Sequence, residues 1–167
     1  MGMDVGFGRL TRLARLALLL AMEVVLSRFL SIATPIAKIG FGFVPVVLAA
    51  VLYGPLWAGA LGGLADFLGA ILFPTGAYFP GFTLTAALVG CVYGWFLFDR
   101  PITWKNTLGA VSVVSLVCHL GLNTLWLLVI SGYGAMALLP TRAVQTAVMA
   151  VLQVLAIRLL AKVEIGK

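Results

Sequence analysis

The chain has 167 residues, of which 63% are hydrophobic and only 10% are charged, whereas a soluble domain usually carries about 25% charged residues. Water is therefore not its main solvent. Eleven Lys and Arg against five Asp and Glu give a net charge of +6, but these basic residues are scattered at the ends of apolar segments, so membrane topology explains them better than nucleic-acid binding.

The apolar segments predict an all-α integral membrane protein, a six-transmembrane-helix bundle that forms a single domain over residues 1–167. Within a bilayer only helices and closed barrels satisfy their backbone hydrogen bonds, and these segments are long and do not alternate polar with apolar residues. A spanning helix needs roughly 20 mostly apolar residues. The predicted helices cover, in chain order, about residues 10–30, 39–53, 55–73, 81–98, 106–130 and 140–162.

Turn signals set several of these boundaries. Pro35 ends the first helix, and an outer loop is predicted over about 31–40. The Gly54-Pro55 pair divides a long apolar stretch into two helices joined by a tight hairpin. Pro140 is predicted to open the last helix, because proline suits the first turn of a helix.

The distribution of basic residues predicts the orientation in the membrane. Six spans place both termini on one side, and Lys and Arg are enriched on the cytoplasmic side. Eight of the eleven basic residues fall on the side of the termini: Arg9, Arg12, Arg15, Arg100, Lys105, Arg158, Lys162 and Lys167. Arg28, Lys38 and Arg142 fall at the other end, so we expect both termini in the cytoplasm.

Ionisable residues inside the bilayer are functional candidates, because each costs about 2.5 to 3.5 kcal/mol on insertion scales. Asp66 lies on a glycine-rich helix, where we expect it either to pair with Arg28 or Lys38 or to accept hydrogen bonds from an amino group of a ligand. Glu23, Asp66 and His119 leave a second function open, a stand-alone proton-coupled carrier that uses them as a relay.

Two helices carry polar stripes. On the fifth, His119, Asn123 and Trp126 are spaced i, i+4, i+7 and so share one face. Asn123 and Trp126 are candidate ligand contacts, with His119 deeper in the bilayer; alternatively, Asn123 only bonds another helix. The sixth helix carries a similar stripe: Arg142, Gln145 or Thr146, Met149 and Gln153. Arg142 either snorkels to the headgroups or faces inward, and the stripe favours the inward position.

The outer loops add basic and aromatic residues around these stripes. They are Lys38, Phe41, Tyr78, Phe79 and Phe82. Flat rings bordered by basic groups suit a planar, anionic ligand, since aromatic faces stack and arginine binds carboxylate in a bidentate fork. The alternative is the ordinary aromatic belt of a membrane interface.

Other patterns concern partners and chemistry. Ala17 and Ala21 lie one helical turn apart, which allows close packing against this bundle or against a partner. The Gly-x-x-x-x-Gly-Lys-Ser/Thr nucleotide loop, metal-binding His/Cys clusters and nucleophile motifs are absent from the sequence, so we expect no enzyme, no cofactor and no metal. Cys91 and Cys118 are interpreted as core residues.

Several segments resemble the substrate-binding S components of energy-coupling factor (ECF) vitamin transporters, in particular the folate-specific branch. They are Ala17-x-x-x-Ala21, Lys38-Ile39-Gly40-Phe41, Leu52-Tyr53-Gly54-Pro55, Tyr78-Phe79-Pro80-Gly81-Phe82-Thr83-Leu84-Thr85-Ala86, and Asn123-Thr124 with Arg142. The resemblance implies a prokaryotic membrane protein that binds its vitamin from outside. It also implies docking, through Ala17 and Ala21, on a membrane coupling protein with two cytoplasmic ATPases that use the ATP.

Folate has a planar pterin, a benzoyl ring and a glutamate with two carboxylates, which agrees with the inferred site. We expect Trp126 and outer-loop aromatics to stack on the rings, Asn123 or Asp66 to read the pterin edge, and a basic residue to meet carboxylate. The predicted ligand-binding residues are Arg28, Lys38, Phe41, Asp66, Tyr78, Phe79, Phe82, Asn123, Trp126, Arg142 and Gln145. Riboflavin or thiamine is the alternative vitamin. Arg28 lies close to the Ala17 face at 100° per residue, so it reaches the interior only where the helix ends or unwinds.

Overall fold

The computed structural model describes residues 3–33, 38–74, 78–132 and 135–162. Its elements are α1 (Met3–Arg28), β1 (Ser31–Ala33), β2 (Lys38–Gly40), α2 (Phe43–Tyr53), α3 (Pro55–Leu72), α4 (Pro80–Leu97), α5 (Trp104–Val113), the π-helical segment η1 (Val114–Leu122), α6 (Asn123–Ser131) and α7 (Ala135–Lys162). The segments α5, η1 and α6 follow one another without a break. The fold is therefore almost entirely helical, as predicted, with one small hairpin added.

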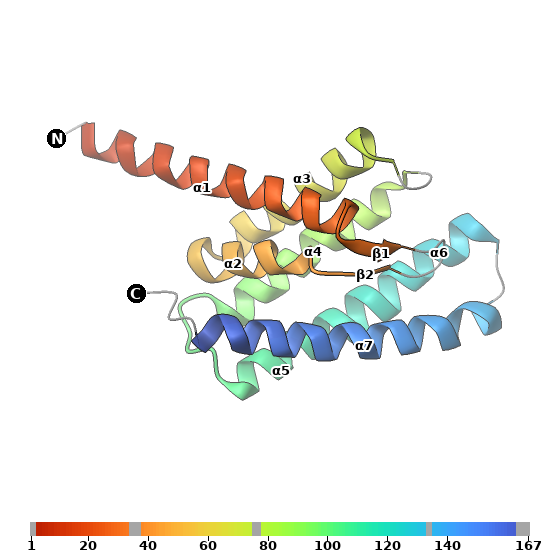
Figure 1. Ribbon diagram of the computed structural model, residues 1–167. Helices are drawn as coiled ribbons and strands as arrows, with labels where there is room; N and C mark the ends of the chain where they lie inside the picture. The colour runs from red at the N-terminus through yellow and green to blue at the C-terminus, as the bar shows by residue number, and fades with distance from the viewer. Residues whose placement is uncertain (1–2, 34–37, 75–77, 133–134, 163–167) are drawn as a thin grey trace.

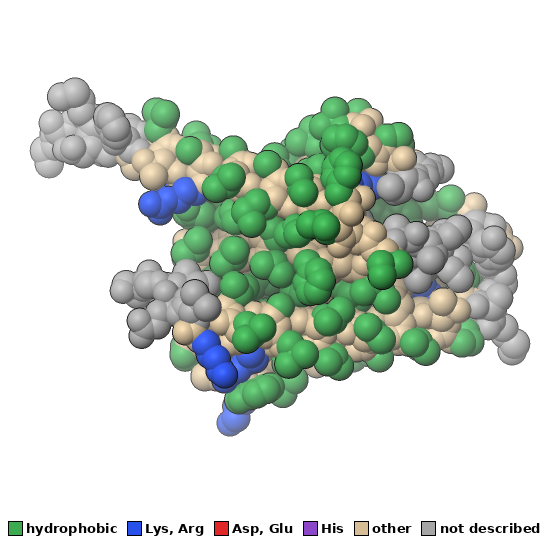
Figure 2. All heavy atoms as spheres, viewed as in Figure 1, with side chains coloured by type: hydrophobic (Ala, Val, Ile, Leu, Met, Phe, Trp, Pro, Cys, Tyr) green, Lys and Arg blue, Asp and Glu red, His purple; other side chains and the backbone are tan. Residues whose placement is uncertain are grey.

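Four of the six helices in the described part of the chain are long and apolar enough to cross a membrane: Pro55–Leu72, Pro80–Leu97, Trp104–Ile130 and Leu138–Lys162. Helix α2 is apolar but has only 11 residues. Helix α1 carries Arg9, Arg12 and Arg15 on its exposed first half. Hydrophobic side chains cover most of the face shown in Figure 2, and Lys and Arg gather near the start of α1 and the end of α7. These features describe a membrane protein, while six spans remain a prediction.

The segment before α2 differs from the prediction. The predicted loop is wrong at residues 31–33 and 38–40, and so is the helix start at residue 39, because β1 and β2 pair antiparallel with Ile32 opposite Ile39. Residues 34–37 of the predicted loop lie outside the described residues. Gly40 permits the pairing, since a Cβ there would lie 2.5 Å from the Cβ of Ser31. Helix α2 begins only after Gly42.

The start of the last helix also differs. Pro140 does not open it, because α7 begins at Ala135 and contains the proline. Proline lacks a backbone N–H, so at this position the helix loses one hydrogen bond, to the carbonyl of residue 136.

Small residues bring α3 and α4 together. A Cβ at Gly62 would lie 2.6 Å from the carbonyl oxygen of Ala86, and Gly90 touches the backbone of Ala58. Such contacts let helices approach closely without a hydrophobic driving force between them. Gly54, with φ 88°, makes the tight turn between α2 and α3, as the sequence predicted.

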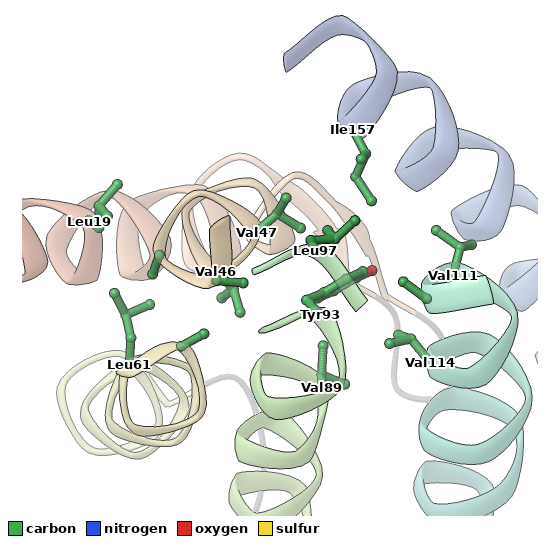
Figure 3. Close-up of a cluster of buried hydrophobic side chains, with 14 of the residues drawn as sticks. Leu19, Val46, Val47, Leu61, Val89, Tyr93, Leu97, Val111, Val114 and Ile157 are labelled. Carbon is green, nitrogen blue, oxygen red and sulfur yellow. The ribbon is translucent and has the colours of Figure 1, made fainter. Parts of the chain in front are cut away.

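The core lies between α4 and its neighbours. Figure 3 shows Tyr93 and Leu97 of α4 surrounded by Val47 of α2, Val111 of α5 and Ile157 of α7. Both cysteines are free thiols, and Cys118 is buried in this core. The core holds α4 in the middle of the bundle.

The arrangement of the elements defines two ends. The hairpin, the connection between α3 and α4, the end of α6 and the start of α7 lie at one end of the molecule, and strand β2 contacts α7. The start of α1 and the end of α7 lie at the opposite end (Figure 1). Most predicted ligand-binding residues belong to the first of these ends.

Candidate functional site

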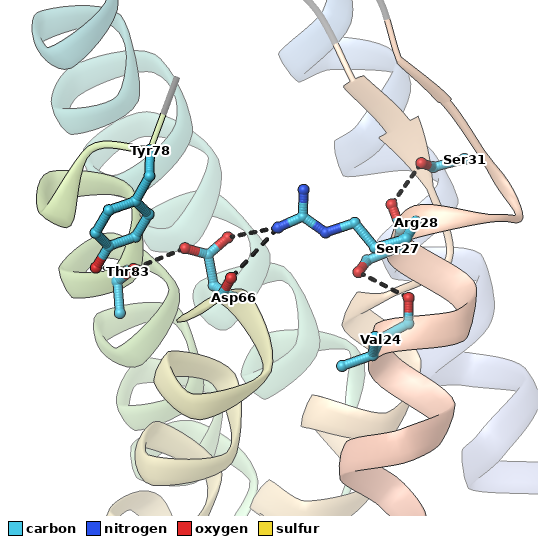
Figure 4. Close-up of polar contacts among 7 residues, drawn as sticks. All are labelled: Val24, Ser27, Arg28, Ser31, Asp66, Tyr78 and Thr83. Carbon is cyan, nitrogen blue, oxygen red and sulfur yellow. Dashed lines mark hydrogen bonds and ion pairs between the residues drawn. The ribbon is translucent and has the colours of Figure 1, made fainter. Parts of the chain in front are cut away.

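An ion pair joins α1 to α3. Arg28 Nη2 lies 3.8 Å from Asp66 Oδ1 and donates a hydrogen bond of 3.3 Å to the backbone oxygen of Asp66 (Figure 4). The arginine side chain passes over Gly69, where a Cβ would lie 2.6 Å from Arg28 Nε. Of the two partners that the sequence left open for Asp66, the structure places Arg28 beside it; the side chain of Lys38 lies outside the described residues.

The end of α1 explains how Arg28 reaches the interior. The helix ends at Arg28, and Ser31 Oγ donates a 2.6 Å hydrogen bond to the carbonyl of Ser27 just beyond it. Because the chain turns into β1 there, the side chain of Arg28 extends toward α3, as Figure 4 shows. The sequence predicted that Arg28, which lies close to the exposed Ala17 face, reaches the interior only if the helix ends there. Helix α1 does end at Arg28.

A threonine of α4 extends the ion pair. Thr83 Oγ1 donates to Asp66 Oδ2 at 2.8 Å and lies 3.2 Å from the hydroxyl of Tyr78. The ring of Tyr78 also packs edge-on against Phe67, with centroids 5.9 Å apart. Asp66 is thus held by groups from α1 and α4. Sequence reasoning did not single out Thr83, although a polar residue in an apolar helix could have marked it.

An aromatic cluster lies beside this network. The centroid of Phe79 is 5.5 Å from that of Trp126 and 6.2 Å from that of Phe82. Trp126 Nε1 donates to Thr85 Oγ1 at 3.0 Å, which ties α6 to the first turns of α4. Gly81 leaves room for the rings, since a Cβ there would lie 2.5 Å from Phe79 and 2.7 Å from Trp126.

Phe41 does not join this cluster in the described structure. Its ring pairs with Phe43, at 6.4 Å between centroids, and is 48% exposed. Phe41 directly follows β2, the strand that contacts α7. A contact of Phe41 with a ligand stays a prediction.

Arg142 is buried rather than extended toward headgroups, with only 5% of the residue exposed. Its Nη2 donates to the backbone oxygen of His119 at 2.9 Å, its Nε to Thr124 Oγ1 at 3.5 Å, and its Nη1 to Gln145 Oε1. The structure therefore supports the inward position of the arginine. Two side chains and one backbone carbonyl fix its guanidinium.

The π-helical segment η1 supplies that carbonyl. The N–H of Asn123 donates to the oxygen of Cys118, five residues earlier, and not to that of His119, as it would in an α-helix. The oxygen of His119 thereby loses its α-helical donor and accepts from Arg142 instead. No sequence pattern indicated this segment, and π-bulges occur frequently at functional sites.

The polar stripes of the two last helices meet at His119. Its Nδ1 lies 3.4 Å from Asn123 Nδ2 and its Nε2 lies 3.5 Å from Gln153 Nε2. Asn123 Oδ1 and Gln153 Oε1 are buried and have no hydrogen-bond partner among the described residues. Asn123 thus bonds within its own stripe, and its buried amide oxygen has no partner among the described residues.

The two arginines belong to separate sets of contacts, which the backbones of α4 and α6 link. Arg28 meets Asp66, which Thr83 bonds; two residues along α4, Thr85 accepts from Trp126. Two residues before Trp126, Thr124 accepts from Arg142. The structure therefore places one cation, one carboxylate and stacked rings at the first turns of α4, and α6 links them to the second cation.

The predicted partner surface lies on α1. Ala17 and Ala21 are exposed. A shallow, wholly apolar hollow lined by Ala21, Met22, Val25 and Leu26 continues along the same helix. Among the residues that the structure describes, no three His, Cys, Asp or Glu side chains form a group that could hold a metal ion.

Comparisons with known proteins agree on one class. A family model described as "ECF transporter, substrate-specific component" matches residues 11–161. A folate transporter FolT of Clostridium novyi (strain NT) is 43% identical over 134 residues, which cover 80% of this chain and 78% of that protein. A folate transporter FolT of Leuconostoc mesenteroides is 39% identical over 114 residues, or 67% of this chain and 60% of that protein. The crystal structure of FolT bound with folic acid matches with a TM-score of 0.88 and 35% identity, covering 93% of this chain and 95% of that one.

Proposed function

We propose that this chain, which belongs to the family of substrate-specific components of ECF transporters, binds folate for uptake across the cell membrane of a bacterium. Membership in a family of transporter components confirms the expectation that the chain is not an enzyme. The names of two relatives and the folic acid in a structurally similar protein support folate as the ligand.

The observation that carries the proposal is the aromatic cluster together with two bound arginines, Arg28 paired with Asp66 and Arg142 bonded to Thr124 of α6. Folate is planar at one end and doubly anionic at the other. Phe79, Phe82 and Trp126 offer ring faces, and arginine recognises carboxylate in bidentate geometry. A buried cation such as Arg142 is expensive in a membrane, which favours a role in binding.

The pterin end has its own candidate groups. Asn123 retains an amide oxygen without a partner among the described residues, and Asp66 accepts from Thr83 with one of its oxygens. Both groups can accept hydrogen bonds from amino and ring N–H groups of a pterin. We assign Asn123 or Asp66 to the pterin edge, and Arg28, Lys38 or Arg142 to the carboxylates.

The orientation and the partners form part of the same proposal. The excess of basic residues at the start of α1 and the end of α7 supports cytoplasmic termini, so that the site opens to the outside. Ala17, Ala21 and the apolar hollow beside them support docking of α1 on a membrane coupling protein. That protein, with two cytoplasmic ATPases, would supply the ATP-driven step.

Ligand retention tests the proposal. The chain is produced in cells supplied with folic acid, riboflavin and thiamine, purified, and denatured to release what it carries. The ultraviolet spectrum and mass of the released compound should be those of a folate. Release of riboflavin or thiamine instead would assign a different vitamin to the site.

A further inference from the structure

The hydrogen bonds around His119 cannot all form as the atoms stand. Its two ring nitrogens each face the NH2 group of an amide, Asn123 at 3.4 Å and Gln153 at 3.5 Å. A neutral imidazole has one donor and one acceptor nitrogen, so it accepts from only one of these two NH2 groups. One of the two amides must therefore present its oxygen to the ring.

Rotation of an amide by 180° exchanges its oxygen and nitrogen with almost no change in shape, and the two atoms are hard to tell apart. Two consistent arrangements follow. In the first, Asn123 donates to Nδ1 and the Nε2–H of His119 donates to the oxygen of Gln153. In the second, Gln153 donates to Nε2 and the Nδ1–H of His119 donates to the oxygen of Asn123.

The two arrangements differ in what Asn123 offers to a ligand. In the first arrangement its free amide atom is an oxygen, an acceptor; in the second it is the NH2 group, a donor. Gln153 is fully buried in α7. Its amide orientation sets which nitrogen of the histidine ring carries the proton, and this in turn sets the amide orientation of Asn123. Asn123 lies one helical turn before Trp126, whose ring belongs to the aromatic cluster.

We infer that His119 and Gln153 are positioning residues that set the amide orientation of Asn123, and that a bound pterin selects one of the two arrangements. This inference rests on the proposed folate function. The pterin touches Asn123, while the histidine tautomer and the Gln153 amide adjust behind it. The site can thus match either a donor or an acceptor on the ligand edge with the same three side chains.

Asn123, His119 and Gln153 together form a hydrogen-bonded relay, and Arg142 holds it in place. Its bond to the backbone oxygen of His119 fixes the histidine at the end of η1. The same arginine disfavours a third arrangement, in which a doubly protonated imidazolium donates to both amide oxygens. That arrangement would add a second cation beside a buried guanidinium in an apolar interior.

The sequence contains a single histidine, so its tautomer can be read directly. The full chain, labelled with 15N-histidine and reconstituted in lipid nanodiscs, is measured by NMR without ligand and with saturating folic acid. We expect signals averaged over two neutral tautomers without ligand and one neutral tautomer with folic acid. Unchanged signals, or an imidazolium in the bound state, would overturn the inference.

Calorimetry on the same sample separates the two proposals. Unchanged histidine signals together with measurable folic acid binding overturn the relay and leave the folate function intact. Absence of folic acid binding removes the folate function, and the relay with it. p-Aminobenzoylglutamate, which lacks the pterin, should leave the histidine signals as they are in the free protein; an equal response to it would also overturn the inference.

A pair of variants distinguishes positioning from a purely structural role. Gln153→Leu leaves one nitrogen of the ring without its partner, and we expect folic acid affinity to fall about tenfold, the usual scale for a lost buried hydrogen bond. Thr107→Val removes a fully buried hydroxyl from α5, away from the relay, and should leave affinity unchanged. Equal affinities in the two variants would contradict a positioning role for Gln153.

Discussion

Arg142 of α7 donates a 2.9 Å hydrogen bond to the backbone oxygen of His119, 23 residues earlier in the chain. The bond exists because η1 is wound as a π-helix, which withholds the N–H of Asn123 from that oxygen. A local change of helical winding thus creates the acceptor for a buried cation. The same contact fixes the relative position of the two stripes that carry the proposed ligand groups.

Replacement of Arg142 tests its part in binding. Arg142→Gln keeps much of the side-chain volume but removes the charge and the bidentate fork. We expect folic acid affinity to fall at least about tenfold, because hydrogen bonds to charged groups contribute about 1.5–3 kcal/mol each. Isothermal titration calorimetry on purified protein measures this loss.

Arg158 provides the matched control on the same helix. Its Nη1 donates to the carbonyl of Ile102 at 2.7 Å and its guanidinium lies 4.6 Å from the centroid of Trp104, far along α7 from the site. Arg158→Gln should lower the melting temperature and leave folic acid affinity unchanged. If both arginine variants lost affinity equally, a general loss of fold would account for the effect.

The ion pair between Arg28 and Asp66 should contribute modestly to stability. The pair is partly exposed, at 9% and 28% of the two side chains, and exposed pairs contribute at most about 1 kcal/mol. We expect a coupling free energy of this size from a double-mutant cycle of Arg28→Gln and Asp66→Asn. A coupling near zero would show that the backbone bond of Arg28 to Asp66, and not the charge, joins α1 to α3.

Gly81 is required by the aromatic cluster. Gly81→Ala places a methyl group within 2.8 Å of the rings of Phe79 and Trp126, so the rings must separate and folic acid affinity should fall. Gly8→Ala is the control, since a Cβ there meets nothing within 4 Å. Tryptophan fluorescence should change for Gly81→Ala and not for Gly8→Ala; unchanged fluorescence and affinity in both would argue against the cluster as a ligand surface.

The exposed alanines of α1 should matter for transport and not for binding. Ala21→Leu fills the hollow beside Met22 and Val25, so we expect calorimetric binding of folic acid to stay normal while uptake by vesicles that contain the whole transporter is lost. Leu155→Trp enlarges an exposed side chain of α7, on another helix, and serves as control. Normal uptake with Ala21→Leu would place the docking surface elsewhere.

Local patterns in the sequence predicted much of the fold. The bounds predicted for the third and fourth helices, 55–73 and 81–98, differ by one residue at most from Pro55–Leu72 and Pro80–Leu97, because turn residues, Gly54 and the loop ending at Pro80, precede both predicted starts. The hairpin escaped prediction because its strands have three residues each. Three residues are too few for a period to be read.

For the candidate site too, local patterns could be predicted and tertiary contacts could not. The helical spacing of His119, Asn123 and Trp126 predicted a shared polar stripe, although α-helical geometry gave no sign of the π-helical winding at His119. The partner of Asp66 stayed open because Arg28 is 38 residues away, and tertiary pairing over that distance leaves no local pattern. Thr83 and Thr85 were not singled out as site residues, although polar residues in an apolar helix could have marked them.

The most direct test of the proposed folate function is a calorimetric titration of the purified chain with folic acid, riboflavin and thiamine under the same conditions. We predict one binding site with nanomolar affinity for folic acid and no measurable heat from the other two vitamins. Tight binding of riboflavin or thiamine, with none of folic acid, would contradict it.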